Sequence, residues 1–284
     1  FHAISAFCNA GFDLMGGQQQ YASFTAYATD PVINITLMLL IIVGGLGFVV
    51  WSDVVLKRFR WKNYCLHTKM VISVTLLLIF GGALFLFLFE QGGTISGMST
   101  GDQILASLFG SVTARTAGFN TVDTGALQPE SKLLTIALMF IGGSPGSTAG
   151  GVKTTTIAVI LIYVISNLRG ESGCNVFHRR IGDEVFKRAS MVFCLNVFLG
   201  LICVTLILET SNLRMSDVLF EVYSAISTVG MTTGITRDLN VVGRIVIIIL
   251  MYCGRIGSMT FALSLVAKPE AKGLSLPEEK ITIG

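Results

Sequence analysis

The chain alternates between long apolar runs and short polar segments. Crossing a bilayer takes about 20 mainly apolar residues. Five stretches meet or approach that length with at most one charge: Val32–Trp51, Met70–Phe89, Leu133–Val152 with its continuation Thr154–Leu168, Met191–Leu208 and Ile245–Ala267. The pattern predicts five membrane spans, of which the third is unusually long and broken.

Basic residues collect in alternate loops, after the first, third and fifth spans: Lys57, Arg58, Arg60, Lys62 and Lys69; Arg169, Arg179, Arg180, Lys187 and Arg188; Lys268, Lys272 and Lys280. Cytoplasmic loops of membrane proteins carry an excess of Lys and Arg. We therefore expect these loops and the C-terminus on the cytoplasmic side. The composition agrees with a membrane protein, because only 13% of the residues are charged, against about 25% in soluble domains.

A short segment recurs three times on the predicted outer side: Asn9-Ala10-Gly11, Thr116-Ala117-Gly118 and Thr228-Val229-Gly230. Gly118 lies 107 positions after Gly11, and Gly230 lies 112 positions after Gly118. A fixed period indicates a repeat architecture. Potassium filters use a Thr-Val-Gly-type loop whose backbone carbonyls replace the hydration shell of the ion. A single such tripeptide is often a helix-packing site, but three copies at matched spacing favour an ion filter.

The second and third recurring segments each sit in a setting of span, short outer helix, loop and span, and the first has only the second half of that setting. The outer helices predicted at Asp102–Arg115 and Asp217–Ser227 are too short to cross a bilayer, so they must be buried in protein or line a water-filled cavity. We expect an all-α membrane protein built from such units. Residues 1–66 would hold the second half of a unit, 67–168 a unit with a broken second span, and 169–284 a further unit with the C-terminal tail.

The break in the third span is rich in glycine, with five glycines and a proline in ten positions: Gly142, Gly143, Pro145, Gly146, Gly150 and Gly151. Such a segment cannot remain an ordinary helix, and non-helical backbone at membrane depth lines a cavity. A nucleotide-binding P-loop is disfavoured, because Val152 separates Gly151 from Lys153 and the strand-then-helix setting is missing. The segment is interpreted as a gate in an ion path.

Two cations accompany this segment. Arg255 interrupts the last span, where an Arg costs roughly 2.5–3.5 kcal/mol and needs a partner or water. We expect it beneath the filter, against the glycine-rich loop, as a barrier or latch; the alternative is an Arg that only donates to loop carbonyls. Lys153 is the second gate candidate, and its alternative is to reach the cytoplasmic interface.

Other kinds of chemistry find little support. The six cysteines are scattered without the spacing of a metal site or a disulfide framework. His2, His67 and His178 lie far apart in the sequence, and no acid–nucleophile grouping occurs within the spans. We expect no enzymatic activity, no covalently bound cofactor and no nucleic-acid partner.

Together these features resemble the ion-translocating subunit of the Trk/Ktr/HKT superfamily of potassium transporters. The resemblance covers nearly the whole chain and rests on Ser5–Asp13, Ala114–Asn120, Gly142–Thr156, Ser227–Gly234 and Gly254-Arg255. The Asn-Ala-Gly-Phe-Asp run of the first copy is more similar to the Ktr branch than to the Trk branch.

The resemblance implies four units in a pseudo-fourfold arrangement around one pore in a bacterial plasma membrane. It also implies that one and a half units precede Phe1 and that Pro277–Gly284 is a native C-terminus. The three recurring loops would line the filter, and the Gly142–Thr156 loop would gate it with Arg255 as its partner.

Potassium is the transported ion that the resemblance implies, with sodium as a stimulating or second ion. The implied partners are membrane lipid, a second copy in a homodimer and a cytosolic ring of nucleotide-binding regulatory subunits. A Trk-branch transporter and a secondary cation symporter with broken helices stay open as alternatives. A tetrameric channel is disfavoured, because the copies are non-identical and fused in one chain.

Overall fold

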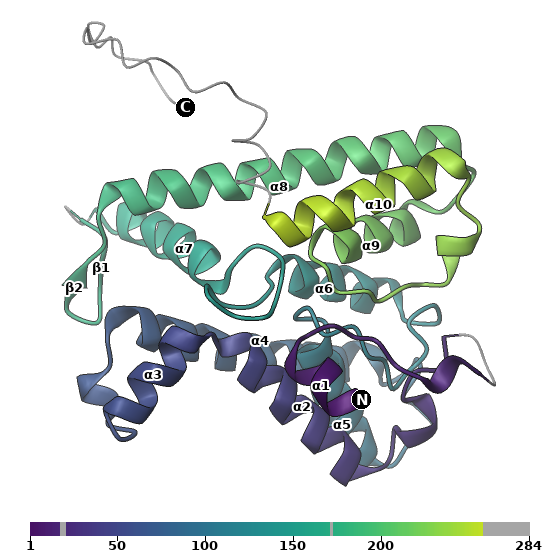
Figure 1. The fold of residues 1–284 in the computed structure, drawn as a ribbon, viewed down its shortest axis with the longest axis horizontal. Helices are drawn as coiled ribbons and strands as arrows, with labels where there is room; N and C mark the ends of the chain where they lie inside the picture. The colour runs from purple at the N-terminus through teal and green to yellow at the C-terminus, as the bar shows by residue number, and fades with distance from the viewer. Residues whose placement is uncertain (18–20, 171–172, 258–284) are drawn as a thin grey trace, which may run out of the picture.

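The computed structural model describes residues 1–17, 21–170 and 173–257, and they form two facing layers of helices (Figure 1). The helices are α1 His2–Phe7, α2 Pro31–Leu46, α3 Phe48–Leu56, α4 Leu66–Glu90, α5 Thr100–Thr113, α6 Pro129–Phe140, α7 Thr154–Leu168, α8 Asp183–Thr210, α9 Met215–Ile226 and α10 Val241–Ile256. One small hairpin pairs β1 (Asn175–Val176) with β2 (Arg179–Arg180). The predicted all-α membrane fold is confirmed.

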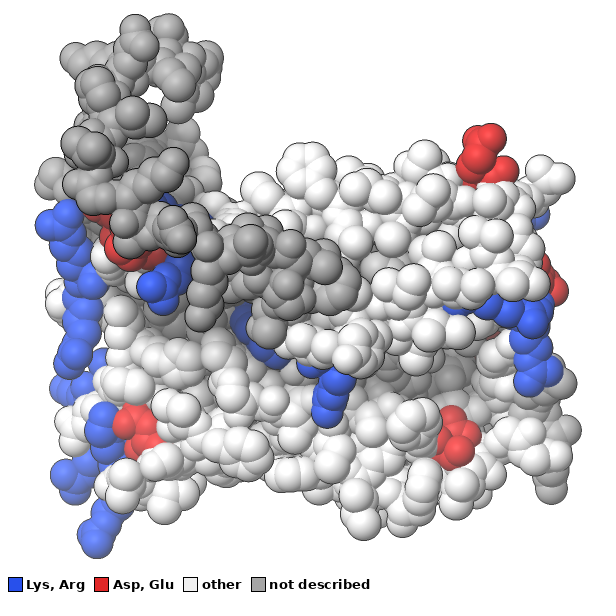
Figure 2. Space-filling model, turned by 45° about the horizontal axis from the view of Figure 1, so that its top comes forward, with Lys and Arg blue, Asp and Glu red and all other residues white. Residues whose placement is uncertain are grey.

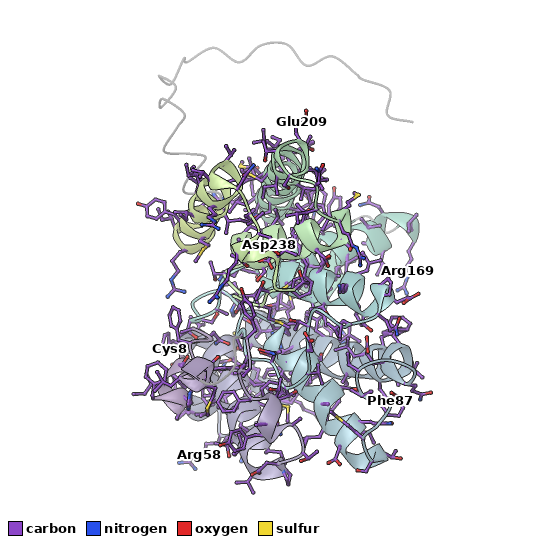
Figure 3. The ribbon with its side chains drawn as sticks, turned by 90° about the vertical axis from the view of Figure 1, so that its right-hand side faces the viewer. Cys8, Arg58, Phe87, Arg169, Glu209 and Asp238 are labelled. Carbon is purple, nitrogen blue, oxygen red and sulfur yellow. The ribbon has the colours of Figure 1, made fainter. Side chains whose placement is uncertain are left out.

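The first five helices make one layer and the last five make the other. Figure 3 looks at the molecule from the right-hand side of Figure 1 and places Cys8 at the edge of the first layer and Glu209 at the far edge of the second. Within the layers, α5 packs on α4 and α2, while α9 packs on α6, α8 and α10. The short helices α5 and α9 thus lie inside the bundle, where their buried faces contribute Phe109 and Phe220 to the core.

Two helices of the described residues, α4 and α8, are each long and apolar enough to cross a membrane, and α2 with α3 would make a third span if counted as one. The predicted span Val32–Trp51 is wrong as a continuous helix, because α2 and α3 meet at an angle of 94°. The predicted break in the third span is confirmed: α6 ends at Phe140 and α7 begins at Thr154. The last predicted span corresponds to α10, and its residues 258–267 lie outside the described residues, as does Pro277–Gly284.

The bend between α2 and α3 occurs at Gly47, whose φ is 93°. L-residues with a side chain rarely adopt this conformation. The position also lies against the glycine-rich loop, because a Cβ at Gly47 would come within 2.6 Å of the Pro145 carbonyl oxygen. The amide of Phe48 donates to the Gly146 carbonyl at 3.1 Å. The loop between α6 and α7 therefore occupies the space into which a straight continuation of α2 would run.

Many of the Lys and Arg side chains gather at one end of the molecule, the end that carries α3 and the β1–β2 hairpin, while others lie in the middle and at the opposite end (Figure 2). Arg58 and Arg60 follow α3, and Arg179 and Arg180 form β2. The filter-like loops lie toward the opposite end from this basic face. This separation is the charge asymmetry expected of a chain that crosses a membrane several times.

Replacing Gly47 by Ala should lower the melting temperature of the protein in detergent. An alanine at this position is strained both by the positive φ and by the contact with Pro145, and we expect this strain to lower the free energy of unfolding by about 1–3 kcal/mol. Gly81→Ala in α4 is the matched control, since no heavy atom outside its own helix lies within 4 Å of the added methyl. Equal melting temperatures for both variants would contradict the need for glycine at the bend.

Candidate functional site

The three recurring loops have the same backbone conformation. Each begins with a non-glycine residue of positive φ and continues to a glycine of positive φ. The angles are 49° and 70° for Asn9 and Gly11, 77° and 93° for Thr116 and Gly118, and 55° and 86° for Thr228 and Gly230. A positive φ in a non-glycine residue is uncommon. Its recurrence at the first position of all three loops therefore indicates that the loops share one backbone conformation.

Each loop directly follows a short helix and continues its hydrogen bonding. The amide of Ala10 donates to Ser5 at the end of α1, and the amide of Val229 donates to Ser224 at the end of α9, both at 2.9 Å. After α5, the amide of Ala117 donates to Thr113 at 2.9 Å. The helix ends therefore fix where each loop starts and in which direction its carbonyls run.

The loops lie head to tail. A Cβ added to Gly11 would overlap the carbonyl oxygen of Ala117, and one added to Gly118 would overlap the carbonyl oxygen of Val229. At Gly230 no heavy atom of the described chain lies within 4 Å of that position. The tertiary structure thus places the second loop between the first and the third, and the three loops together are called the arc.

A cavity of about 170 Å³ opens above this arc and is lined by all three of its glycines. Asp13 and Asp123 line the same cavity. Each carboxylate also caps its own turn, because Asp13 accepts from the Met15 amide and Asp123 from the Gly125 amide, both at 2.9 Å. Two carboxylates at the mouth of a cavity raise the local concentration of cations.

Side chains behind the loops hold two of them in place. The Thr113 hydroxyl donates to the Phe119 carbonyl and the Ser224 hydroxyl to the Met231 carbonyl, both at 2.6 Å. Phe119 and Met231 are themselves buried, whereas Phe12 at the matching position of the first copy is 70% exposed. Phe119 and Met231 therefore pack behind their loops, whereas most of Phe12 is exposed among the described residues.

Glu221 on α9 fastens the third loop, a role that the sequence analysis missed. Its side chain is 6% exposed and accepts hydrogen bonds from the Thr232 hydroxyl, from the Thr233 amide at 3.1 Å and from the Thr236 hydroxyl at 3.0 Å. Thr232 is also joined to the middle copy, because its carbonyl accepts from the Thr124 hydroxyl. The available sequence signal is an acid in the apolar second half of a short helix, upstream of a Thr-rich segment.

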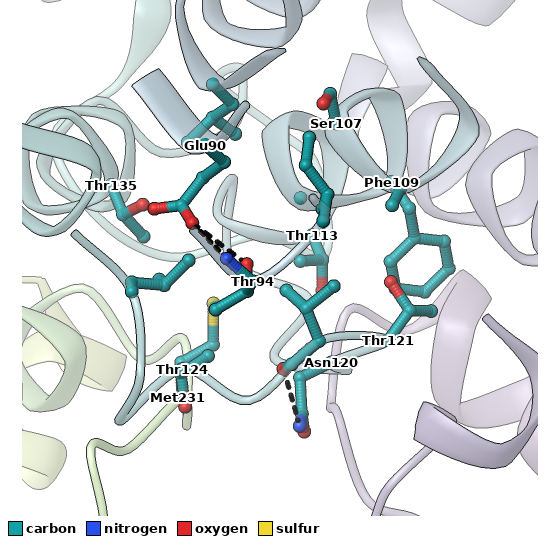
Figure 4. A pocket seen from close by; sticks show the side chains of 16 residues that line it. Glu90, Thr94, Ser107, Phe109, Thr113, Asn120, Thr121, Thr124, Thr135 and Met231 are labelled. Atoms are coloured by element: carbon teal, nitrogen blue, oxygen red, sulfur yellow. Dashed lines mark hydrogen bonds between the residues drawn. The ribbon is translucent and has the colours of Figure 1, made fainter. Parts of the chain in front are cut away.

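A second buried carboxylate, Glu90 at the end of α4, plays a similar part in the middle unit. It accepts from the Thr94 amide at 2.8 Å, from the Thr94 hydroxyl at 2.9 Å and from the Gln128 amide at 2.8 Å. Figure 4 shows Glu90 and Thr94 on one side of a cavity of about 30 Å³, with Asn120 and Thr121 of the outer segment on the other. Glu90 therefore ties the loops before and after α5 to the end of α4.

The glycine-rich segment, residues 141–153, forms a loop beside the arc. Its ends are joined by the Gly142 amide, which donates to Val152 at 3.0 Å, and the Ser144 amide reaches Gly45 on α2 at 3.0 Å. The Asn9 side-chain amide donates to the Thr148 hydroxyl at 2.9 Å. A Cβ at Gly150 would overlap the hydroxyl of Thr228. The loop that contains all five predicted gate glycines thus contacts the first and third filter-like loops.

Both predicted gate cations lie at this loop and bond to its backbone. Lys153 Nζ donates to the Ala149 carbonyl at 2.7 Å, and Arg255 Nη1 donates to the Thr148 carbonyl at 3.2 Å. Neither makes an ion pair with a described residue. Among the described residues there is also no group of three His, Cys, Asp or Glu side chains that could hold a metal ion.

Comparison with known proteins gives one consistent result. A family model described as TrkH, cation transport protein, matches residues 1–275. The chain is 40% identical over 291 residues to the potassium/sodium uptake protein NtpJ of Enterococcus hirae, and 39% identical over 289 residues to the Ktr system potassium uptake protein B of Bacillus subtilis. Each match covers 100% of this chain and 63% of the relative.

One solved structure shares the fold. The crystal structure of the potassium transporter TrkH from Vibrio parahaemolyticus matches with a TM-score of 0.74 at 20% identity, over 93% of this chain and 57% of that one. The chain therefore spans about 63% of the length of the curated relatives that it matches, and the described helices correspond to part of a longer helical fold.

Replacing Glu221 by Gln should speed hydrogen–deuterium exchange of the Thr233 amide about tenfold. The reason is that a hydrogen bond to a charged group contributes about 1.5–3 kcal/mol, and the Gln amide nitrogen cannot accept from a Thr hydroxyl. Glu209→Gln, at the exposed end of α8 (Figure 3), is the control and should leave this exchange unchanged. The exchange rates are measured by mass spectrometry of peptides covering residues 232–236. Unchanged rates in Glu221→Gln would show that Glu221 does not hold the third loop in place.

Proposed function

Because the chain belongs to the TrkH family of cation transport proteins and is similar over its whole length to Ktr-type proteins, we propose that it takes up potassium. The path would run through the arc formed by the three filter-like loops. The observation that carries the proposal is the head-to-tail contact in which Gly11 lies against Ala117 and Gly118 lies against Val229. That contact sets carbonyl-bearing loops side by side.

Carbonyl oxygens suit a monovalent cation that must lose its water. They replace the hydration shell without a fixed charge, so that the ion can both enter and leave. The carboxylates of Asp13 and Asp123 at the cavity above the arc supply the outer attraction for cations. Potassium is also the ion in the names of the relatives quoted above.

The glycine-rich loop is the proposed gate, with Lys153 and Arg255 as its cationic partners. Both side chains donate to carbonyls of this loop, so they neutralise backbone oxygens that would otherwise attract a passing cation. Two positive charges beneath a cation filter also raise the electrostatic barrier to conduction. Movement of the loop would remove both effects together.

The remaining assignments complete the proposal. Residues 1–66, 67–168 and 169–284 correspond to successive units of a pseudo-fourfold pore, with the basic face of Figure 2 and the C-terminus in the cytoplasm. A second copy and a ring of nucleotide-binding subunits are the proposed partners, and no catalytic reaction is proposed. Sodium enters as a stimulating or second ion, because one relative is named for both ions.

The first test is rubidium influx in bacteria that lack potassium uptake, using the whole natural polypeptide with and without its regulatory subunit. Influx that saturates and is blocked by excess potassium is the expected result, and stimulation by sodium is expected with it. Absence of influx from protein shown to reach the membrane, even with the regulatory subunit present, would contradict the proposal.

Gly118→Ser in the whole protein should reduce selectivity for potassium over sodium, about tenfold or more, because the new Cβ would push the Val229 carbonyl out of the arc. Gly81→Ser, on the open side of α4, is the matched control and should keep wild-type selectivity. Competition of sodium with rubidium influx measures both. Unchanged selectivity in Gly118→Ser would exclude this loop from the filter.

Arg255→Ala should raise the rubidium flux several-fold at unchanged selectivity, since one cation beneath the arc and its bond to Thr148 are lost. Deleting Gly146–Gly150 should act in the same direction. Arg244→Ala, at the other end of α10 where the side chain bonds the Arg237 carbonyl, is the control. Lower flux with normal expression in both gate variants would mean that the loop supports the pore and does not close it.

A further inference from the structure

A groove of about 450 Å³ lies among α4, α7 and α8, away from the filter-like arc. Its walls are mostly apolar and include Met70, Val159, Val185 and Val192. Three basic side chains also line it, those of His67, Arg180 and Arg188, and the part of the groove that they line is called its basic end. One groove thus combines an apolar trough with a basic end.

The two arginines have no partner in the described part of the chain. Neither Arg180 nor Arg188 belongs to any of its three ion pairs, and neither guanidinium group donates a hydrogen bond there. Two of the acids nearby are engaged elsewhere: Glu184 pairs with Lys187 at 3.2 Å, and Asp53 accepts from the Cys65 amide at 3.0 Å and pairs with Lys57. Asp183, in the first turn of α8, makes no ion pair. The groove therefore presents unneutralised guanidinium groups beside apolar walls.

The position of the groove selects the kind of ligand. His67 is the second residue of α4, and Arg188 lies in the second turn of α8. The basic end of the groove therefore lies at the starts of two helices long enough to span a membrane, at the basic face (Figure 2). From there the apolar walls follow the helices into the membrane-embedded part. Basic pockets between spans at the cytoplasmic side suit anionic lipid headgroups, and the guanidinium fork matches phosphate oxygens.

We propose that this groove binds one anionic phospholipid. Its phosphate lies between Arg180 and Arg188, and one acyl chain lies along Met70, Val159 and Val192. A free phosphate ion would use only the basic end, and a zwitterionic lipid would leave the net positive charge uncompensated. The apolar walls and the charge together therefore favour an anionic lipid over both.

The bound lipid would also contact the helix that carries the glycine-rich loop. Thr155 and Thr156 of the first turn of α7 line the groove. They follow Lys153, which bonds to the loop at Ala149. An acyl chain in the groove would therefore restrict the start of α7 and, through it, the loop.

The test is lipid retention by the purified whole protein, measured by native mass spectrometry after exchange into detergent with phosphatidylglycerol or phosphatidylcholine. The wild type should retain one phosphatidylglycerol in preference to phosphatidylcholine. R180Q/R188Q should bind phosphatidylglycerol about tenfold to thirtyfold more weakly, since each basic group near a lipid surface contributes about 1 kcal/mol. R58Q/R60Q removes two arginines after α3 that do not line the groove, and it should keep wild-type retention.

A second variant tests the apolar part without changing charge. Val159→Trp fills the trough and should also release the lipid, whereas inorganic phosphate at millimolar concentration should not displace it. Retention that is unchanged in R180Q/R188Q, or lost equally in R58Q/R60Q, would overturn the proposal. So would displacement by phosphate alone or equal retention of phosphatidylcholine. Because lipid binding is measured without ion flux, these outcomes stand apart from any failure of the uptake assay.

Discussion

Close contact between backbone carbonyls and glycines is the constraint on which this structure depends. Two of the filter-like loops approach a neighbour only because Gly11 and Gly118 have no Cβ to displace a facing oxygen. The glycine-rich loop closes on itself in the same way, where Gly142 faces the Gly150 carbonyl. The spacing of carbonyl oxygens decides which ion they can surround. A methyl group at these positions would therefore change the chemistry of the site as well as its packing.

Buried carboxylates keep these thin loops in place. Glu90 and Glu221 sit on different elements of their units, yet each accepts hydrogen bonds from a backbone amide and a hydroxyl of the outer segments. A buried acid must be satisfied by such donors, because an unpaired polar group in apolar surroundings costs several kcal/mol. The donors come from the segments beside the filter-like loops, so the same hydrogen bonds satisfy the acid and hold those segments in place.

The glycine-rich loop is held differently. Its bonds include backbone contacts with Gly44 and Gly45 on α2 and with Phe48, together with bonds from the side chains of Lys153, the last residue of the loop, and Arg255 on α10. Such a segment buries few apolar side chains, and regions with few apolar contacts open at low free energy. A loop held by individually modest bonds, between rigid neighbours, can change position without unfolding the helices around it.

The local sequence predicts an element of this protein well where the residues of that segment alone determine its structure. The spans α4 and α8 follow from uninterrupted apolar runs, the break before α7 follows from its glycines, and the three filter-like loops follow from their repetition. The bend at Gly47 does not, because its apolar surroundings read as a continuous span and its cause is contact with Pro145, far along the chain. Likewise, Arg180 and Arg188 read only as surface charges until the packing of α4, α7 and α8 places them in the lining of one groove. Hydrophobic periodicity and glycine content act over a few residues, whereas the contacts that complete a bend, a braced loop or a groove join segments that only tertiary packing brings together.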